Sequence, residues 1–257
     1  MANILFKKSF QHNIFKKILF DELWNKKGIF TTIHVLGKPR NFLFLKEHLC
    51  KLNQSLQFFS INFKIDNTLF NIVEKNLFKK NIYYDHLFRI AINNKKISFS
   101  LRKKVKIKNN FTGVLVTYQR PKWRLKHLQY NKVIKFLKKI NSNYEEIILT
   151  KNNFIYEGAT TNIIFVKNNI IYLPKNGFYF GITLKFLLKK NKRRTIKKNI
   201  KIDQLHDYDE ILLVGTGKGV VYVEKIPQIN WYMRKITIFN EFQRIYKSYI
   251  NKKIATK

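Results

Sequence analysis

The stretch YEGATTNIIFVKNNIIYLPKNGFYFGIT, residues 156–183, decides the fold of this chain. An acid-Gly pair leads through Thr-Thr-Asn into an apolar strand, and a polar turn joins that strand to a second one. Gly181-Ile182-Thr183 then precedes the apolar run LKFLL, which indicates the start of a helix. Free backbone amides at a helix start bind anions through hydrogen bonds and the helix dipole. The layout can therefore place one carboxylate, that of Glu157, and one anion-binding helix end in the same pocket.

The composition is that of a globular protein. The 257 residues can bury a full core, as one large domain or two modest ones, and the hydrophobic share of 45% argues against disorder. No apolar run approaches the roughly 20 residues that span a bilayer, so we expect no membrane partner. The single cysteine, Cys50, excludes an internal disulfide framework and any multi-cysteine metal site. We therefore expect a reducing, cytoplasmic location.

The charge is strongly basic, with 51 Lys+Arg against 15 Asp+Glu and a formal net charge of +36. Such a surplus is typical of proteins with a polyanionic partner such as nucleic acid. Only 9 of the 51 are arginine, however, and a phosphate-reading surface favours arginine for its bidentate fork. The other abundant residues, Asn, Ile, Phe and Tyr, share A- and T-rich codons with Lys. Drift in an AT-rich genome explains all of them together, and we expect no specific nucleic-acid partner.

A basic nucleic-acid-binding protein is the alternative from a different class. It would need aromatic side chains interleaved with Lys and Arg on one sheet face. The pairs Phe58-Phe59 and Tyr83-Tyr84 form no such stripe. The first 20 residues, MANILFKKSFQHNIFKKILF, are basic and partly amphipathic, but acidic residues follow at once and no small-residue cleavage site is present. We expect a first strand and turn there rather than a targeting peptide.

The first part of the chain, residues 1–119, reads as a small α+β domain. GIFTTIHVL at 28–36 is a strand in which Phe30, Thr32 and His34 share one face and Thr31, Ile33 and Val35 the other. Two amphipathic helices are expected next, and then three strands of one sheet. The helices are predicted at 44–60 and 66–79, and the strands at 87–92, 96–101 and 111–118.

The linker is expected at about 119–125, where Pro121 interrupts the pattern, and residues 120–257 are expected to form a larger domain. It begins with a helix at 127–140, and four strands joined by Lys-Asn-Asn turns are expected to form a meander. A helix is predicted from about Ile182, and the lysine-rich 189–201 reads as a solvated surface stretch. The four strands are predicted at 145–150, 154–157, 161–166 and 169–173. Further strands at 210–214 and 219–223 precede a last helix at 237–250.

Several residues could carry chemistry, and each also has an ordinary interpretation. Lys126 is one lysine among many, and Glu157 at a strand end could be a turn former or a surface ion. Thr183 could simply cap its helix. The loop GTGKG that begins at Gly215 departs from the phosphate-binding GxxxxGK[ST] pattern because Val220 follows it, although Thr216 could offer a hydroxyl to a phosphate. No histidine shows metal-ligand spacing, so no metal is expected at His34, His48 or His127.

Taken in order, these segments resemble the class IV, or fold type IV, pyridoxal 5′-phosphate (PLP) enzymes. The match E-G-x-x-x-N-I-I-F runs from Glu157 to Phe165, G-I-T follows at Gly181 to Thr183, and GTGKGVVYV resembles the family's second phosphate-binding loop. The resemblance implies PLP as cofactor, a small-molecule substrate and a homodimer. It also implies a two-domain α+β / α/β fold whose larger C-terminal domain has a β-barrel-like core flanked by helices.

The resemblance assigns roles residue by residue. Lys126 matches the family's Schiff-base lysine, and Glu157 matches the acid that keeps the pyridine nitrogen protonated, which makes the ring an electron sink. Ile182 and Thr183 match the backbone amides at the phosphate.

Thr216 matches the hydroxyl on the other side of the phosphate. Lys51 stands where the family usually has a phosphate-binding arginine, so the charge is kept and the fork is lost.

Two segments favour one reaction within the family. Gly28-Ile29-Phe30-Thr31-Thr32 resembles the GxFTT segment of 4-amino-4-deoxychorismate lyases, and residues 125–128, LKHL, resemble the IKHLN segment of the same lyases. Such a lyase makes 4-aminobenzoate and pyruvate for folate synthesis. Branched-chain aminotransferase and D-amino-acid aminotransferase remain the alternatives. Phe30, Thr32 and His34 are the expected substrate contacts.

Overall fold

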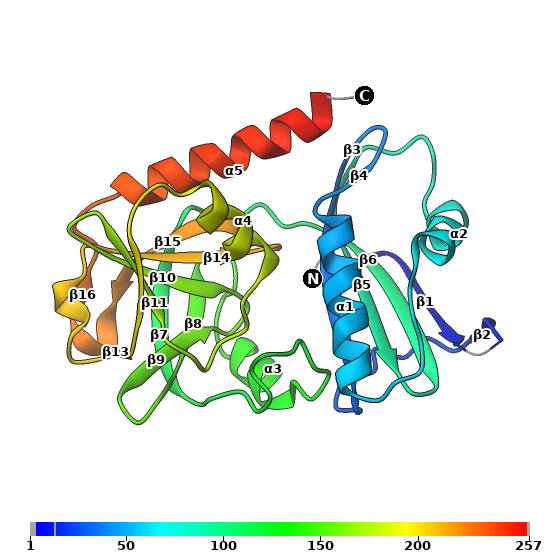
Figure 1. Cartoon of the computed structure of the whole chain (residues 1–257), viewed down its shortest axis with the longest axis horizontal. Helices are drawn as coiled ribbons and strands as arrows, with labels where there is room; N and C mark the ends of the chain where they lie inside the picture. Colours follow the sequence, from blue (N-terminus) through cyan, green and yellow to red (C-terminus); the bar gives the residue numbers. More distant parts are fainter. Residues whose placement is uncertain (1–3, 13, 256–257) are drawn as a thin grey trace. The chain divides into compact units, whose positions relative to one another are not determined.

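The computed structural model describes residues 4–12 and 14–255, and Figure 1 shows their helices and strands. The chain forms two compact units, each with its own core. The first unit consists of Met1–Val105, Leu125–Asn131 and Ile250–Lys257, and the second of Lys106–Arg124 and Lys132–Tyr249. The predicted sequence boundary between residues 119 and 120 stays a prediction.

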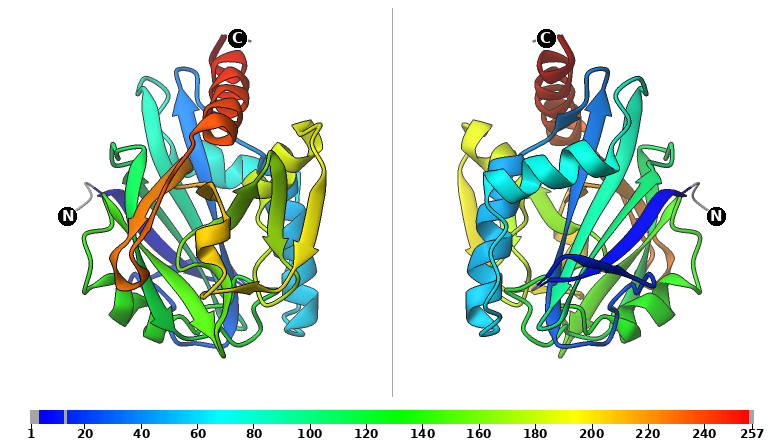
Figure 2. Two further views of the ribbon diagram at one scale, coloured as in Figure 1. Left: turned by 90° about the vertical axis from the view of Figure 1, so that its left-hand side faces the viewer. Right: turned by 90° about the vertical axis from the view of Figure 1, so that its right-hand side faces the viewer.

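The first unit is built on a six-stranded antiparallel sheet with the order β2-β1-β6-β5-β3-β4. The expected first strand is present as β1, which pairs with β2 on one side and with β6 on the other (Figure 2). The strands are β1 (Ile4–Gln11), β2 (Lys16–Ile18), β3 (Gly28–Gly37), β4 (Asn41–Phe42), β5 (Tyr84–Asn93) and β6 (Lys96–Lys103).

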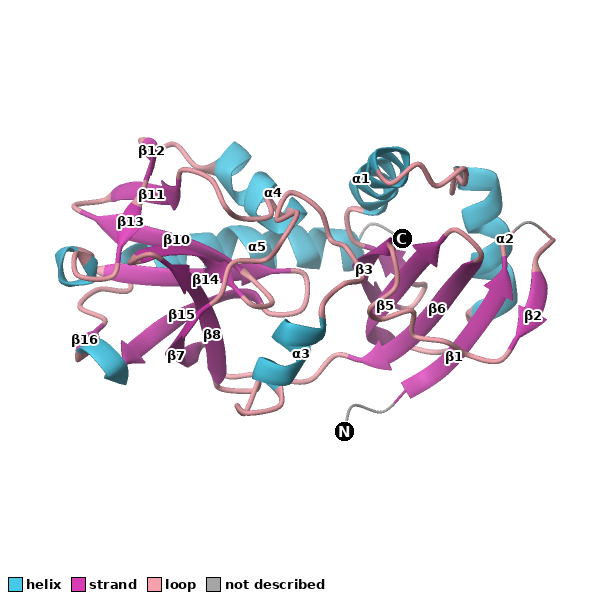
Figure 3. Cartoon of the chain, turned by 90° about the horizontal axis from the view of Figure 1, so that it is seen from below, coloured by secondary structure: helices cyan, strands magenta, loops and turns pink. Residues whose placement is uncertain are grey.

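Two helices, α1 (Leu45–Phe58) and α2 (Asn67–Leu77), cover one face of this sheet (Figure 3). Leu49 and Leu52 of α1 pack in one buried cluster with Ile33 and Val35 of β3. The helical spacing of the leucines and the alternation along β3 produce this core directly. Phe30 lies on the opposite face of β3, which the two helices do not cover.

The second unit contains a ten-stranded sheet whose main path is β12-β11-β10-β14-β15-β7-β8-β9-β13, with β16 beside β15. The two ends of that path, β12 and β13, are separated in sequence by Asn199 alone. Consecutive Cα atoms lie about 3.8 Å apart, so the sheet must curve until its ends meet. This is the β-barrel-like core that was predicted. Its strands are β7 (Asn110–Thr117), β8 (Glu145–Lys151), β9 (Phe154–Gly158), β10 (Asn162–Lys167), β11 (Ile170–Pro174), β12 (Thr195–Lys198), β13 (Ile200–Lys201), β14 (Glu210–Gly215), β15 (Gly219–Ile226) and β16 (Trp231–Tyr232).

Helices flank this barrel, and the expected starts near 182 and 237 are confirmed. Buried Phe242 and Tyr246 attach the last helix, and buried Leu184 and Leu187 attach α4. The helices are α3 (Asn131–Leu137), α4 (Ile182–Lys190) and α5 (Thr237–Ala255), with 3-10 turns at Leu205–Asp207 and Pro227–Ile229.

Three predictions about local structure are wrong. The strand predicted at 111–118 is present as β7, but it pairs in parallel with β8 and β15 in the second sheet rather than with β5 and β6. Its buried Phe111 packs in the second core. The error arises because an apolar strand pattern indicates a strand without indicating which strand it pairs with.

The four strands at 145–174 are not a meander. They form two hairpins, β8-β9 and β10-β11, and three other strands stand between the hairpins in the sheet. Both hairpin turns carry an Asn-Asn pair at positive φ (50° and 64°, then 51° and 60°), which suits tight type I′ turns. The residues from Gly158 to Asn162 are not a hairpin turn and lead the chain to a different neighbour.

The helix predicted from residue 127 begins only at Asn131. Residues 126–128 instead pair with β3 through an isolated bridge at His127 and two flanking backbone hydrogen bonds. Their backbone hydrogen bonds outweigh the helical spacing of the apolar side chains that follow.

Candidate active site

Lys126 is held by its main chain against the first strand of the predicted site. Its carbonyl accepts the N–H of Phe30 (2.9 Å), and two residues later the N–H of Leu128 donates to Gly28 (2.9 Å). A Cβ on Gly28 would lie 2.3 Å from the carbonyl oxygen of Ile92 and 2.8 Å from Leu128, so only glycine permits this approach. The Lys126 ammonium lies 5.6 Å from the centre of the Phe30 ring.

The three predicted substrate contacts lie on β3 of the same unit. Phe30 and Thr32 are half-buried, and Thr32 stands directly opposite Arg89 of β5. His34 is buried and its Nε2 lies 2.7 Å from the Asp85 carboxylate. This hydrogen bond lowers the pKa of Asp85.

Lys51 and Lys126 both act on a buried histidine of α1. The Nδ1 of His48 lies 2.7 Å from the hydroxyl of Thr31, and its buried Nε2 has no hydrogen-bond partner among the described residues. Burial lowers the pKa of His48 to about 3, and the charges of Lys126 and Lys51 act in the same direction. This part of the first unit is therefore positive and favours an anion.

In the second unit, Glu157 forms a buried bidentate ion pair that was not predicted. The Nε of Arg120 donates to Oε1 and a terminal nitrogen donates to Oε2, both at 2.7 Å. The two side chains are 5% and 3% exposed. A buried carboxylate needs such compensation, and the planar fork fixes its orientation as well as its charge.

Glu157 is connected to the start of α4 through a chain of hydrogen bonds. Its Oε2 accepts the N–H of Tyr179 (3.1 Å), whose carbonyl accepts the side-chain amide of Asn162. The Oδ1 of Asn162 accepts the N–H of Gly181 (3.0 Å), the residue that precedes the helix. The stretch 156–183 therefore does link its carboxylate to its helix end, and Asn162 is the connector.

The N-terminus of α4 is suited to an anion. No side chain caps it at Gly181, while Ile182 and Thr183 occupy its first turn. A Cβ on Gly181 would lie 2.4 Å from Oδ1 of Asn162, so the close approach requires glycine. The exposed amides of such a turn and the helix dipole attract a phosphate.

Thr216 lies in the turn between β14 and β15, next to Gly215. The Cα of Gly215 lies close to Thr160 and Thr161, since an added Cβ would be 3.3 Å from the Thr160 carbonyl. The hydroxyl of Thr161 is buried and has no hydrogen-bond partner among the residues that the structure describes. An uncapped helix start and an orphaned hydroxyl are features that a phosphate-bearing group satisfies, so the residues present fit PLP.

Lys218, in the same turn, forms an ion pair with a buried carboxylate. Its ammonium lies 2.9 Å from the buried carboxylate of Glu146, which also accepts the N–H (3.0 Å) and the hydroxyl (2.7 Å) of Thr160. Glu146 thus ties the Thr216 turn to the loop that follows Glu157. Lys218 is a structural residue here, in agreement with the departure of GTGKG from a nucleotide-binding loop.

The site residues fall into two groups, one on each unit. Lys51, Lys126 and the β3 residues belong to the first unit, and Glu157, Ile182, Thr183 and Thr216 to the second. Sequence reasoning missed Arg120 and Asn162. Asn162 was already part of the E-G-x-x-x-N match, and Arg120 is one of only 9 arginines, which was the signal available.

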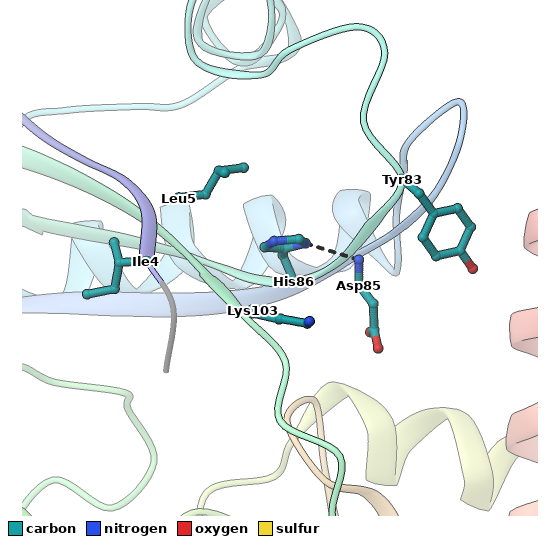
Figure 4. A pocket seen from close by; sticks show the side chains of 6 residues that line it. All are labelled: Ile4, Leu5, Tyr83, Asp85, His86 and Lys103. Atoms are coloured by element: carbon teal, nitrogen blue, oxygen red, sulfur yellow. Dashed lines mark hydrogen bonds between the residues drawn. The ribbon is translucent and has the colours of Figure 1, made fainter. Parts of the chain in front are cut away.

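An open cavity of about 490 Å³ on the first unit holds none of the predicted cofactor residues. Ile4, Leu5 and Tyr83 give it an apolar rim, and the side chains of Asp85, His86 and Lys103 are grouped within it (Figure 4). The ring of His86 accepts the N–H of Asp85 (3.0 Å). Asp85 connects the cavity to a predicted site residue, through its hydrogen bond with His34.

Comparison with known proteins identifies relatives of this chain. Residues 28–226 match the family described as amino-transferase class IV. A probable branched-chain-amino-acid aminotransferase of Rickettsia bellii (strain RML369-C) is 32% identical over 101 residues, which are 38% of this chain and 34% of that protein. The match therefore spans about a third of the relative's length.

Solved structures of low sequence identity share the fold. The branched-chain aminotransferase of the archaeon Thermoproteus uzoniensis, solved with norvaline, has a TM-score of 0.78 at 16% identity and covers 97% of this chain and 96% of its own. A putative 4-amino-4-deoxychorismate lyase from Legionella pneumophila has a TM-score of 0.70 at 18% identity and covers 86% and 90%. The predicted fold class is confirmed. Among residues 4–12 and 14–255, no helix is long and apolar enough to cross a membrane, and no three His, Cys, Asp or Glu side chains are grouped for a metal ion.

Proposed function

Because the chain belongs to the class IV aminotransferase family, we propose that it is a PLP-dependent enzyme whose reaction is that of 4-amino-4-deoxychorismate lyase. It would release pyruvate from 4-amino-4-deoxychorismate and leave 4-aminobenzoate, for folate synthesis. Formation of the aromatic ring drives that step.

One observation carries the choice of reaction. The two segments that resemble the lyases, Gly28 to Thr32 and residues 125–128, are hydrogen-bonded to each other. The two threonines of the first segment lie on opposite faces of β3. Thr31 is hydrogen-bonded to His48, whereas Thr32 shares the face of Phe30. The lyase-like features are thus parts of one local structure around Lys126.

The residues of the proposed site divide the work by their chemistry. Bound PLP supplies an electron sink for the carbanion at the substrate α-carbon. Lys126 would hold the cofactor, and its amine, when free, is the base that would remove the α-proton of the substrate. Glu157, oriented by Arg120, would interact with the pyridine nitrogen and would favour its protonated form.

The phosphate is proposed to bind at the start of α4. Ile182 and Thr183 donate backbone amides, and the hydroxyl of Thr216 adds a further donor. Lys51 contributes positive charge without the bidentate fork of arginine. Each of these groups acts on the ground state and the transition state alike, so they hold the cofactor rather than select the reaction.

A branched-chain or D-amino-acid aminotransferase is the second candidate. The Rickettsia bellii relative, a probable branched-chain-amino-acid aminotransferase, favours it. In a transaminase the amine of Lys126 would also return a proton, whereas in the lyase the substrate would lose its β-substituent instead. The first steps and the residues that perform them are the same.

A paired assay decides between the two reactions. Purified protein with added PLP is incubated either with 4-amino-4-deoxychorismate or with glutamate and 2-oxoisocaproate. We expect 4-aminobenzoate and pyruvate in equal amounts from the first mixture. Amino-acid formation in the second mixture together with no 4-aminobenzoate in the first would establish the transaminase.

Cofactor binding has its own test, which is independent of substrate. Lysine-bound PLP absorbs visible light, so the mixture of protein and PLP is expected to show that band. Lys126→Ala should abolish it, whereas Lys139→Ala, at an exposed position just after α3, should not. A band that survives in Lys126→Ala would remove Lys126 from its proposed role.

We also propose a homodimer, as the family resemblance implies, and a cytoplasmic location stays a prediction. The formal charge of +36 opposes self-association at low salt because the Debye length is then long. Light scattering in buffer of about 0.3 M salt, where the charges are screened within several ångströms, should therefore give a dimer mass. A monomer at all salt concentrations would contradict the proposal.

A further inference from the structure

The strand pair β1-β2, residues 4–12 and 14–20, exposes large aliphatic side chains at the edge of the first sheet (Figure 3). We call it the basic hairpin. Leu19, directly after β2, is 92% exposed, and Ile14, just before β2, is 65% exposed. Five residues separate them, so their Cα atoms lie at most about 17 Å apart. A single exposed aliphatic side chain is common, but two that flank one short strand indicate a contact surface.

The charge of the basic hairpin has one sign. Residues 4–20 contain no Asp, Glu or Arg. The lysines of the hairpin are Lys7, Lys8, Lys16 and Lys17. Asp21, the first acid that follows, is paired with Lys26 and with Lys96 (3.1 Å). The negative charge next to the hairpin is therefore compensated by other residues of the unit, and the hairpin lysines suit an external anion.

Lysine and apolar side chains share one face of the hairpin. Ser9 of β1 is paired with Ile18 of β2, and alternate residues of a strand lie on the same face. Lys7 and Lys16 therefore stand on the face of Ile18. The Lys7 ammonium also lies 5.3 Å from the centre of the Phe20 ring. Such a mixed face can bury its apolar parts while the long lysine side chains keep their ammonium groups at a polar boundary.

The chemistry of this face favours an anionic lipid surface over a nucleic acid. Proteins bind nucleic acids through arginine forks and through aromatic rings on which bases stack. The hairpin contains no arginine, and its most exposed apolar side chains, Leu19 and Ile14, are aliphatic. Aliphatic side chains enter the headgroup region of a bilayer, and lysines are attracted to its anionic lipids.

We propose that the basic hairpin docks this protein on an anionic membrane surface, with Leu19 and Ile14 inserted among the lipid headgroups and the four lysines at the lipid phosphates and carboxylates. The sequence led us to expect no membrane partner because no apolar run spans a bilayer, but docking at the surface requires no spanning segment. The inference is independent of the reaction, because the hairpin contains none of the predicted site residues.

The test is co-sedimentation of the full-length protein with lipid vesicles in about 0.1 M salt, where the Debye length is about 10 Å. One set of vesicles contains phosphatidylserine and phosphatidylcholine in a ratio of about one to two, and the other contains phosphatidylcholine alone. Wild type should bind the first set and not the second. No binding of wild type to the anionic vesicles would overturn the proposal.

Two variants separate the charge of the hairpin from its apolar contact. Each lysine at such a surface strengthens binding about 5-fold, so Lys16→Gln with Lys17→Gln should weaken binding about 25-fold. Leu19→Ser keeps every charge and should weaken binding about 10-fold, because the inserted leucine side chain is lost. Both changes are at exposed positions, and circular dichroism should show an unchanged fold. Unchanged vesicle binding in Leu19→Ser would contradict insertion of the hairpin.

A matched control excludes attraction by the net charge of the whole chain. Lys189→Gln with Lys190→Gln removes the same charge from the exposed last turn of α4 and should weaken vesicle binding much less than the hairpin pair does. An equal loss in both pairs would show that any basic face of the protein binds the vesicles, and the proposal would fail. The same variants are also tested with single-stranded oligouridylate. If the hairpin variants lost RNA binding and kept vesicle binding, a nucleic acid would replace the membrane as the partner.

Discussion

Loss of Arg120 is expected to be among the most damaging single changes in the second unit. Arg120→Met preserves most of the side-chain length and removes the fork that satisfies both oxygens of Glu157. The carboxylate then stays buried without its bidentate partner, because the two side chains are only 5% and 3% exposed in the native protein. Breaking a buried pair from one side costs about 3–5 kcal/mol, well above the cost of losing a surface pair.

The same geometry predicts a strong coupling. Glu157→Gln removes the charge and keeps an acceptor for the N–H of Tyr179. The double variant Arg120→Met with Glu157→Gln leaves neither charge of the pair buried, so it should be more stable than the sum of the single effects by about 2 kcal/mol. Additive effects would show that the pair contributes no coupling.

The assay is urea unfolding of protein prepared without PLP, followed by circular dichroism. Absence of the cofactor matters because a weaker cofactor complex would otherwise lower the apparent stability by mass action. Arg244→Met is the matched control for a lost arginine on an exposed surface and should stay within about 0.5 kcal/mol of wild type. A cost below about 1 kcal/mol for Arg120→Met, the size expected of a surface pair, would refute the reasoning.

Three other changes test separate parts of the structure. Burial and two lysines lower the pKa of His48 to about 3 in the folded protein. Its neutral form therefore contributes stability that is complete above the unfolded-state pKa of about 6.5 and is lost as the pH falls toward the folded-state pKa. His48→Gln should reduce the loss of unfolding free energy over that pH window. The buried carboxylate of Glu210 accepts the N–H groups of Ile238 (3.0 Å) and Phe239 (2.9 Å) at the start of α5; Glu210→Ala should cost about 2 kcal/mol in urea unfolding, and a cost near zero would mean that water replaces the cap. A Cβ on Gly158 would lie 2.1 Å from the Thr161 hydroxyl oxygen; Gly158→Ala should cost about 1–3 kcal/mol in thermal unfolding, and adding Thr161→Ala should recover part of it.

Local chemistry made most of the elements predictable. The alternation at 28–36 and the leucine spacing of the first helix predict both partners of the first core, and the Asn-Asn pairs predict two tight turns. Pairing across long sequence distances was not predictable. β7 follows β6 in the chain but pairs in parallel with β8 and β15. Parallel strands are joined by long connections, so no turn sequence between them reveals the pairing.

The candidate site shows the same division. Glu157 and the start of α4 were predicted from their local patterns, whereas the connection through Asn162 was missed although Asn162 lies within the E-G-x-x-x-N motif. The ion pair of Glu157 with Arg120 was not, because 37 residues separate the partners and Arg120 lies in a stretch that reads as a linker. A buried charge in a sequence implies a partner without naming it.

The positions of the few arginines nevertheless indicate structural roles that the net charge of the chain does not show. Among 51 basic residues only 9 are arginine, and several of them stand where the planar fork matters. Arg120 pairs with Glu157 in the core, and Arg89 stacks on Trp24. Lysine can replace arginine where only charge is required, but it supplies neither two parallel hydrogen bonds nor a stacking plane. In a composition that drifts toward lysine, an arginine is therefore more informative about structure and binding than the net charge, and the basic surface need not have a partner of its own.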